Sequence, residues 1–456
     1  MTEVERRRVH SGATPDQVAA DLADLIQFED DGMSLTDLEN LIRQQLEPHF
    51  VRYDLPHFHS LFNTFLEPGA ALGAEIALEW NQGVTNWQVS PGGAMLEELC
   101  CKALCRLFGL DQRADGTVMY SGTYANQQAL YMALHRRAEE RGFDLAEQGL
   151  AGFDDPTRLA IVTSVEAHFS LKHAARFLGL GEQCLVPIRV DENRRMDAAS
   201  LRAKVAEVQE SRDIVCVVAT SGTTSTGSVD PVAAIADTSD ELGTWLHVDG
   251  AYGLAYKLVP ERAELFAGIE RADSVSWDPH KQFGVPIPSS MLFVRRPEDF
   301  GRVALFSSYW NRADATEPNP GTKSIPSTRP LTVLPLVASI RHQGLDNLVQ
   351  RLRAPIVAAR DLHQYLQQQP DFATCHTPDT GIVCFRIVPE HVPAERLDDL
   401  QRHIYRVILT EGRHTTSITE IGGQSALRFV AISPQVTFEA MKDTIEEIRR
   451  VAGEFS

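Results

Sequence analysis

Near the N-terminus, hydrophobic residues recur every three to four positions, which is the spacing of an amphipathic helix. Two stretches show this spacing, TPDQVAADLADLIQFE from Thr14 and SLTDLENLIRQQLEPHF from Ser34. Each begins at a residue whose side-chain oxygen can accept a hydrogen bond from a free amide of the first helical turn. The pattern predicts a helical segment over residues 1–75.

From about residue 90 to residue 300 the pattern changes to short apolar runs that alternate with helical stretches. These runs are rich in β-branched residues and predict the strands GTVMYSG, RLAIVTS, CLVPIRV, DIVCVVAT, TWLHVDG and SSMLFVR. The intervals between them leave room for crossover helices, so we expect an α/β fold with a mainly parallel sheet covered on both faces. In such sheets, ligands bind beyond the carboxyl ends of the strands.

After residue 331 the pattern is looser, with the strands GIVCFRIV and ALRFVAI between long helices and TFEAMKDTIEEIRRVA as the last helix. We therefore expect a large domain over residues 76–330 and a small α+β domain over residues 331–456. The stretch between Ser307 and Pro330 is polar and rich in proline. A loop of this length is usually a functional lid or a disordered segment.

The charge balance narrows the range of partners. The chain has 43 Lys and Arg against 62 Asp and Glu, a formal net charge of −19. This balance disfavours binding to nucleic acid or to an anionic membrane, but it permits a small anionic ligand in a local pocket. No apolar run approaches the ~20 residues of a spanning helix, and the N-terminus lacks the apolar core of a signal peptide.

Cysteine placement predicts a reducing compartment. Three of the seven cysteines, Cys100, Cys101 and Cys105, lie at helical spacing within LEELCCKALCRLFGL. A metal site would need further ligands at suitable spacing, so thiols that line the core are the better interpretation. We expect a cytoplasmic protein.

Polar residues follow several predicted strands. Gly122 and Thr123 open a helix after the first strand, an arrangement that can bind phosphate through free amides, although such turns are common. His168 follows the second strand, where a histidine is often structural. Thr220 ends the fourth strand in a cluster of hydroxyls and glycines that also suits a capped turn. Asp249 ends the fifth strand, where a buried carboxylate needs a partner.

The segment SWDPHKQFG places Lys281 among hydrophobic residues, where a lysine cation is costly to bury. A surface lysine, an ion-paired lysine and a snorkelling lysine all fit, and so does a lysine whose amine is covalently occupied. Taken together with the strand-end residues, the last interpretation matches the needs of pyridoxal phosphate. That cofactor takes a lysine for its Schiff base, an aspartate at the pyridine nitrogen, a planar side chain on its ring and a phosphate cradle.

The order and spacing of these motifs resemble the group II pyridoxal phosphate-dependent amino acid decarboxylases over roughly residues 50 to 435. The motifs are SP at Ser90–Pro91, SGTYAN, EAHFSLKHAARFLG, ATSGTTSTGSVDP, HVDGAYG and DSVSWDPHK. The resemblance implies fold type I and a Schiff base on Lys281. It implies further cofactor contacts as follows: His168 stacked on the ring, Asp249 at the pyridine nitrogen, Ala251 beneath the ring, Thr220 near the phenolic oxygen, and Gly122, Thr123 and His280 on the phosphate, with Ser274 and Asp278 as helpers.

The resemblance also implies a homodimer with the site at the interface. The N-terminal helices would wrap the partner, and the segment IPSTRP, with Thr328, would approach the partner's cofactor. The implied reaction is decarboxylation of an L-amino acid through an external aldimine, followed by protonation to an amine.

Two departures qualify this expectation. Many members of the family carry a tyrosine on a mobile loop as the proton donor, but no tyrosine lies between Asn311 and Pro330, and Tyr309 stands at the start of the loop. A lyase, an aldolase or a decarboxylative aldehyde-forming oxidase is therefore the alternative. Tyr120 and Ser121 also replace the Ser-Gly that precedes the phosphate motif in other members.

The stretch NQGVTNWQVSPGGAMLEE resembles the bacterial branch that acts on diaminobutyrate and lysine more than the aromatic branch. It supplies the substrate-contact candidates Asn86, Trp87, Ser90 and Pro91. Trp80 and Trp87 fit core packing equally well. His57 and His59, in LPHFHS, are candidates for lining the pocket or capping a helix.

Overall fold

The computed structural model describes residues 8–307, 311 and 316–455, which form two compact units. The large unit comprises Thr64–Arg353 with Pro378–Thr380, and the small unit comprises Met1–Asn63, Ala354–Thr377 and Gly381–Ser456. This division differs from the three predicted segments, because the N-terminal segment belongs to the same unit as the C-terminal part. Backbone bonds explain the difference: the amide of Val9 donates to the Gly412 carbonyl at 2.8 Å, and that of Val430 donates to the His59 carbonyl at 2.8 Å.

The large unit contains a seven-stranded sheet in the order β1-β7-β6-β5-β4-β2-β3. Neighbours from β6 through β3 run parallel, whereas β7 is antiparallel to both β1 and β6. The predicted mainly parallel sheet is therefore confirmed. Its strands are β1 (Asp115–Met119), β2 (Leu159–Ser164), β3 (Leu185–Ile188), β4 (Asp213–Thr220), β5 (Trp245–Asp249), β6 (Ser274–Trp277) and β7 (Ser290–Val294).

Strand β6 was not among the predicted strands. Its sequence, SVSW, alternates serines with apolar residues, yet all four residues are buried. The two serines lower the hydrophobicity of the run below that of its neighbours, so the apolar pattern misses a strand in the middle of the sheet.

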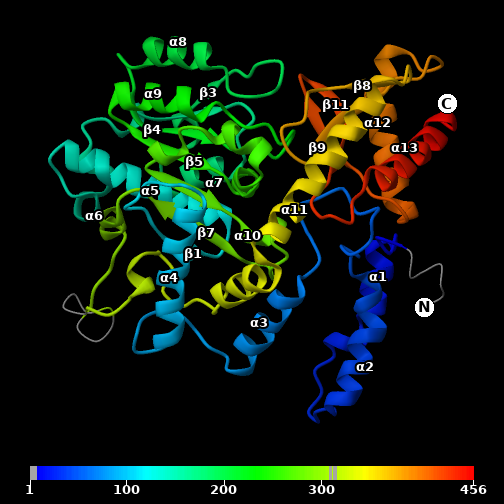
Figure 1. Cartoon of the computed structure of the whole chain (residues 1–456), viewed down its shortest axis with the longest axis horizontal. Helices are drawn as coiled ribbons and strands as arrows, with labels where there is room; N and C mark the ends of the chain where they lie inside the picture. Colours follow the sequence, from blue (N-terminus) through cyan, green and yellow to red (C-terminus); the bar gives the residue numbers. More distant parts are fainter. Residues whose placement is uncertain (1–7, 308–310, 312–315, 456) are drawn as a thin grey trace. The chain divides into compact units, whose positions relative to one another are not determined.

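Helices cover the sheet on both faces (Figure 1). Helix α5 (Gly122–Glu140) crosses several strands and packs with α7 (Ser170–Phe177) in one apolar core. Helix α9 (Val232–Leu242) contacts β4 and β5 but contributes no residue to that core, which places it on the opposite face, where it packs with α8 (Ala198–Val208). The remaining helices of the unit are α3 (Pro68–Glu79), α4 (Pro91–Leu107), α6 (Leu145–Gln148) and α10 (Pro279–Gln282).

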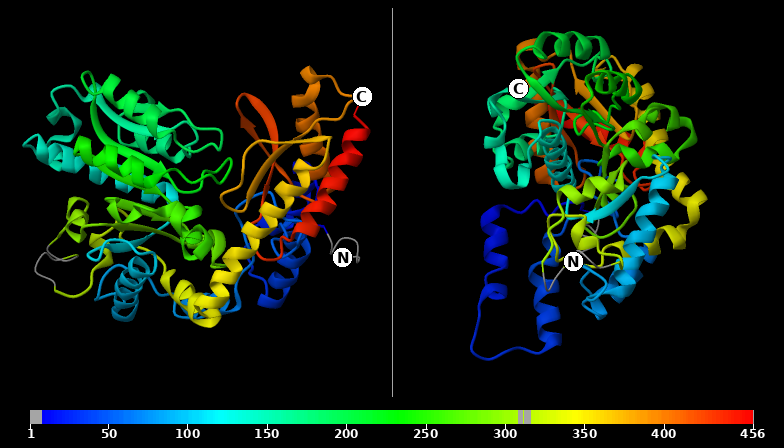
Figure 2. Two further views of the ribbon diagram at one scale, coloured as in Figure 1. Left: turned by 45° about the horizontal axis from the view of Figure 1, so that its top comes forward. Right: turned by 90° about the vertical axis from the view of Figure 1, so that its left-hand side faces the viewer.

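The small unit contains an antiparallel sheet in the order β10-β11-β9-β8 (Figure 2). The C-terminal part of α11, together with α12 and α13, packs on this sheet in one apolar core. The elements are β8 (Phe372–Thr374), β9 (Ile382–Ile387), β10 (Ser417–Ile421), β11 (Gln424–Val430), α11 (Val333–Gln367, which begins in the large unit), α12 (Leu397–Glu411) and α13 (Phe438–Gly453).

The same unit includes the N-terminal helices α1 (Pro15–Asp21) and α2 (Leu35–Gln45). The predicted caps are confirmed: the Thr14 hydroxyl accepts from the Gln17 amide, and the Ser34 hydroxyl accepts from the Asp37 amide.

His59 is fully buried against Phe429, and burial lowers its pKa to about 3. His59 is therefore a residue of the small unit's core rather than a helix cap.

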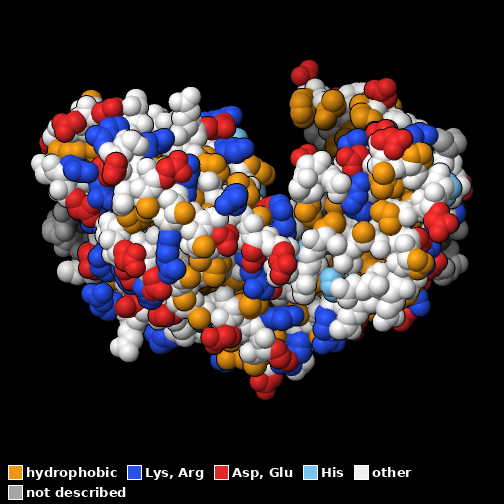
Figure 3. Space-filling view, turned by 90° about the horizontal axis from the view of Figure 1, so that it is seen from above, with side chains coloured by type: hydrophobic (Ala, Val, Ile, Leu, Met, Phe, Trp, Pro, Cys, Tyr) orange, Lys and Arg blue, Asp and Glu red, His pale blue; other side chains and the backbone are white. Residues whose placement is uncertain are grey.

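On the face in Figure 3, Lys and Arg side chains are interspersed with Asp and Glu. None of the helices in the described part of the chain is long and apolar enough to cross a membrane. All seven cysteines are free thiols, and Cys100, Cys101 and Cys105 are buried as predicted.

The stretch from Ser307 to Pro330 is only partly described, and Tyr309 lies outside the described residues. Its C-terminal end is anchored to β1. The buried Arg329 guanidinium donates to the Thr117 hydroxyl at 2.9 Å and to the Val118 carbonyl at 2.6 Å, while the Tyr120 hydroxyl donates to the Thr328 carbonyl at 2.6 Å.

Candidate active site

The carboxyl ends of three adjacent strands bring most of the predicted residues together. Thr220 is the last residue of β4 and pairs in register with Asp249, the last residue of β5, which in turn pairs with Ser276 of β6. Lys281 lies on the short helix α10, which directly follows β6. The parallel order of β4, β5 and β6 is what places residues so far apart in sequence at one edge.

The Lys281 side chain is mostly buried. Its Nζ lies 3.1 Å from Oδ2 of Asp278, and about a fifth of the side chain is exposed. Asp278 also accepts from the Ser290 hydroxyl at 2.7 Å. Of the interpretations open at the level of sequence, the surface lysine is wrong, because this amine is held inside the fold by a buried carboxylate.

Asp249 is buried and held only by neutral donors. Its Oδ2 accepts from the Asn126 amide at 2.8 Å, and its Oδ1 accepts from the Ala251 backbone amide at 3.2 Å and the Ser276 hydroxyl at 3.3 Å. Among the described residues, no Lys, Arg or His nitrogen forms an ion pair with it. A buried carboxylate without a cation is costly, so this site suits a ligand that brings a cationic nitrogen.

His168 follows β2, and the charges of Asp249, Lys281 and Asp278 all act on its ring. Burial lowers the pKa of His168, and the Asp249 carboxylate only partly offsets this. Its Nδ1 accepts from the Ser170 amide at 3.3 Å. A ring kept neutral in this way can lie against a flat heterocycle without placing a second cation beside it.

The N-terminus of α5 has the free amides that the predicted anion cradle requires. Ser121 caps the helix by accepting from the Tyr124 amide at 3.3 Å, which leaves the amides of Gly122 and Thr123 outside the helical bonding pattern. A Cβ on Gly122 would lie 2.9 Å from Oδ2 of Asp278 and 3.3 Å from the Ala251 Cβ. Only glycine leaves room for a ligand here.

Two buried hydroxyls are left unsatisfied in the same region. Neither Thr220 Oγ1 nor Ser221 Oγ has a hydrogen-bond partner among the described residues, although both side chains are buried. An unpaired buried hydroxyl is costly, so a polar ligand at the end of β4 would stabilise it. The unpaired hydroxyls, the glycine cradle and the cation-free Asp249 fit pyridoxal phosphate.

His280 and Ser274 differ in their placement. His280 lies near Lys281 and Asp278, its Nδ1 is 2.6 Å from the Ser289 carbonyl oxygen, and burial lowers its pKa. Ser274 is a correction, because its hydroxyl bonds the Trp245 indole and His247 Nδ1, each at 2.8 Å, and is fully buried. It stands at the amino end of β6, whereas the ligand edge is the carboxyl end, so its hydroxyl cannot serve the phosphate.

The substrate candidates lie at the start of α4. Asn86 accepts from the Val89 amide at 3.1 Å, Ser90 is the N-cap residue and Pro91 the first helical residue. Trp80 and Trp87 are 74% and 39% exposed, so the core-packing interpretation is wrong for both within this chain. A substrate role for these residues stays a prediction.

Three polar residues behind the site were not singled out from the sequence: Asn126, His247 and Ser276. Asn126 lies inside the motif SGTYAN and His247 inside HVDGAYG. For His247 a signal was available: it stands two positions before Asp249, so both side chains lie on the same side of the strand.

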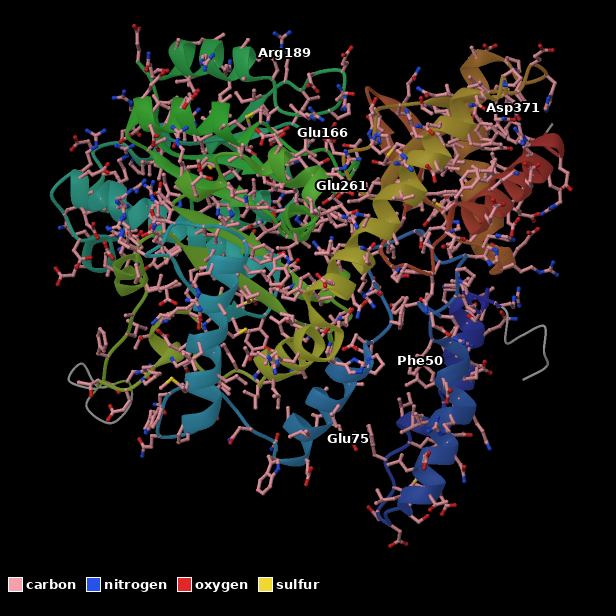
Figure 4. All side chains as sticks on the ribbon, viewed as in Figure 1. Phe50, Glu75, Glu166, Arg189, Glu261 and Asp371 are labelled. Atoms are coloured by element: carbon pink, nitrogen blue, oxygen red, sulfur yellow. The ribbon has the colours of Figure 1, made fainter. Side chains whose placement is uncertain are left out.

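Glu166, labelled in Figure 4, follows β2 and accepts from the Ser225 hydroxyl at 2.8 Å. It helps to hold the hydroxyl-rich loop after β4.

Comparison with known proteins agrees with this geometry. Residues 17–388 match the sequence model described as the pyridoxal-dependent decarboxylase conserved domain. An L-2,4-diaminobutyrate decarboxylase of Acinetobacter baumannii is 26% identical over 379 residues, which cover 81% of this chain and 74% of that protein. The human cysteine sulfinic acid decarboxylase is 29% identical over 349 residues, covering 74% and 69%. The crystal structure of mouse CSAD in apo form superposes with a TM-score of 0.88 at 26% identity, covering 98% of this chain and 93% of that one.

Proposed function

The chain belongs to the pyridoxal-dependent amino acid decarboxylases, and we propose that it removes carbon dioxide from a short diamino acid, with L-2,4-diaminobutyrate as the first candidate. The broader activity, carboxy-lyase chemistry on an amino acid with pyridoxal phosphate, follows from the family and its relatives. The substrate proposal rests on the similarity to the diaminobutyrate enzymes and on the segment NQGVTNWQVSP.

The observation that carries the catalytic assignment is the buried Asp249 carboxylate without a cation, at the edge of the sheet where Lys281 follows β6. When bound, pyridoxal phosphate supplies an electron sink for the pair released from the bond between Cα and the carboxylate. Asp249 would hold a proton on the pyridine nitrogen, Lys281 would offer the amine that joins the cofactor, and His168 would pack on the ring. The amides of Gly122 and Thr123 would bind the phosphate.

Substitution of the lysine tests this assignment. We expect Lys281→Ala to bind no cofactor that borohydride can fix to the chain, and to release no carbon dioxide. Lys204→Ala is the matched control, because this lysine lies on α8 and pairs with Glu207 on the surface. Borohydride reduction followed by peptide mass analysis locates the attachment, and a labelled peptide other than the one with Lys281 would refute the assignment.

A panel of amino acids tests the substrate. L-2,4-diaminobutyrate and lysine carry a cationic side chain, cysteine sulfinic acid an anionic one and tryptophan an aromatic one. We expect the highest kcat/KM for carbon dioxide release with L-2,4-diaminobutyrate. A higher value for cysteine sulfinic acid would overturn the substrate assignment and leave the family assignment intact.

The fate of the carbanion defines a second candidate function. No tyrosine lies between Asn311 and Pro330 to supply a proton, so an aldehyde-forming oxidase, lyase or aldolase outcome is the alternative. A decarboxylase yields carbon dioxide and amine in equal amounts. An aldehyde-forming oxidase yields carbon dioxide and an aldehyde in place of the amine, consumes one oxygen and one water, and releases ammonia and peroxide. All of these products are measured in one reaction.

We further propose that the protein is a homodimer through its N-terminal segment, in a cytoplasmic location consistent with its free thiols. Phe28, Leu35 and Phe50 (the last labelled in Figure 4) are 95%, 85% and 52% exposed, which is unusual for large apolar side chains in one short segment. Sedimentation of wild type beside the double substitution Phe28→Asp and Leu35→Asp tests this proposal. A wild-type protein that sediments as a monomer would refute it.

A further inference from the structure

We propose that His247 is a positioning residue that acts through Asn126 to fix the orientation of the Asp249 carboxylate. The inference rests on the proposed role of Asp249 at the cofactor's ring nitrogen. It concerns a buried chain of side chains behind the site: Trp245, Ser274, His247, Asn126 and Asp249. All five are 5% exposed or less.

Each link of this chain has the length of a good hydrogen bond. The Trp245 indole nitrogen lies 2.8 Å from the Ser274 hydroxyl oxygen, which lies 2.8 Å from Nδ1 of His247. Nε2 of His247 lies 2.9 Å from the Asn126 side-chain oxygen, and the Asn126 amide nitrogen lies 2.8 Å from Oδ2 of Asp249. The chain runs from the amino end of β5 and β6 to the carboxyl end of β5.

The donors and acceptors fix the direction of the bonds that link Asp249, Asn126 and His247. The Asn126 amide nitrogen donates to Asp249 and, at 2.9 Å, to the Ser170 hydroxyl, so both of its hydrogens are used and its oxygen must accept. Nε2 of His247 therefore carries a hydrogen. An indole can only donate, so the Ser274 oxygen accepts from Trp245. Because a neutral imidazole carries one ring hydrogen and that hydrogen is on Nε2, Nδ1 of His247 accepts from the Ser274 hydroxyl.

This assignment makes His247 a neutral imidazole with its hydrogen on Nε2. Complete burial supports the neutral form, because it lowers the pKa of His247 to about 4 even though the nearby Asp249 charge and a backbone hydrogen bond at Ser274 act in the opposite direction.

The consequence for the site is geometric and electrostatic. Asn126 cannot rotate its amide without placing a donor against the Nε2 hydrogen of His247, so its amide nitrogen stays aimed at Oδ2 of Asp249. Asp249 is thereby fixed by neutral donors, and its full negative charge is kept for the ring nitrogen of the cofactor. A cation in the place of His247 would compete for that charge.

The test compares three single substitutions. His247→Phe fills the ring volume but removes both hydrogen bonds. His247→Gln keeps a nitrogen donor near the position of Nε2. His135→Phe is the matched control. His135 lies on α5, is also a buried histidine and stands outside this chain of bonds, and its Nε2 has no partner among the described residues.

Two measurements read the outcome without using turnover. We expect nitrogen NMR of the cofactor-free wild type to show His247 neutral at pH 7 with its hydrogen on Nε2. We expect the dissociation constant for pyridoxal phosphate to rise about tenfold in His247→Phe, the value of one lost buried hydrogen bond. It should rise less in His247→Gln and stay unchanged in His135→Phe.

Equal cofactor affinity in His247→Phe and His135→Phe, or a hydrogen on Nδ1 in the NMR measurement, would overturn the inference. If His247→Phe does not fold, the NMR result and the affinity of His247→Gln decide between the outcomes. A wild-type protein that binds no pyridoxal phosphate would instead refute the proposed function, so the two failures are distinguishable.

Discussion

Asp230 offers the sharpest test of how the large unit holds its active site. This carboxylate is completely buried, and its two oxygens accept from the backbone amides of Met196, at 2.6 Å, and Thr220, at 2.8 Å. Loss of solvation raises its pKa to about 7, although the two amide bonds act in the opposite direction. Because Thr220 ends β4 at the cofactor edge, Asp230 links the charge state of the interior to the position of that residue.

The sign of the effect on stability follows from linkage. The folded protein holds a proton on Asp230 up to about pH 7, whereas the unfolded chain releases it near 3.8. The folded state therefore binds more protons between these values, and the free energy of unfolding falls as pH rises across this interval. The full slope is about 1.4 kcal/mol per pH unit and falls off as pH approaches the folded pKa, so the contribution of Asp230 falls by about 2 kcal/mol between pH 5 and pH 7.

The substitution Asp230→Asn isolates this contribution. Asparagine stays neutral at every pH, and the cost of pointing its amide nitrogen at a backbone amide is independent of pH. We expect urea unfolding to show the variant gaining about 2 kcal/mol on the wild type from pH 5 to pH 7, since all other titrating groups are shared. A difference between the two proteins that is constant over this range would refute the reasoning.

Two further predictions concern the packing and the charge of the site. Gly253→Ala should destabilise the protein by about 1–3 kcal/mol, because its Cβ would lie 2.1 Å from the Ser221 carbonyl oxygen. Gly301→Ala is the control and should leave stability unchanged, because no atom lies within 4 Å of its Cβ. Equal unfolding midpoints for the two variants would contradict this prediction. Asp278→Asn should tighten the binding of pyridoxal phosphate about tenfold, because it removes a negative charge beside the phosphate cradle. An unchanged or weaker affinity in a fluorescence titration would show that the ion pair between Asp278 and Lys281 matters more than repulsion between Asp278 and the phosphate.

The sequence by itself determined the parts of this protein that depend on local pattern. Apolar runs predicted six of the seven strands of the large sheet, because each run is short, hydrophobic and bounded by turn residues. The caps at Thr14 and Ser34 followed from side chains that reach an amide three residues away. Asp249 was found because a polar residue at the end of an apolar strand is conspicuous, and Lys281 because a lysine cation among hydrophobic residues is costly to bury.

Tertiary structure alone decided which of these residues meet and how their protons are arranged. Ser274 and Ser276 differ by two positions, yet only Ser276 reaches Asp249, because the two serines stand at opposite ends of one short strand. The bond between Asn126 and His247 joins residues 121 positions apart. The direction of such a hydrogen bond depends on every other partner of both side chains, and those partners come together only when the chain has folded.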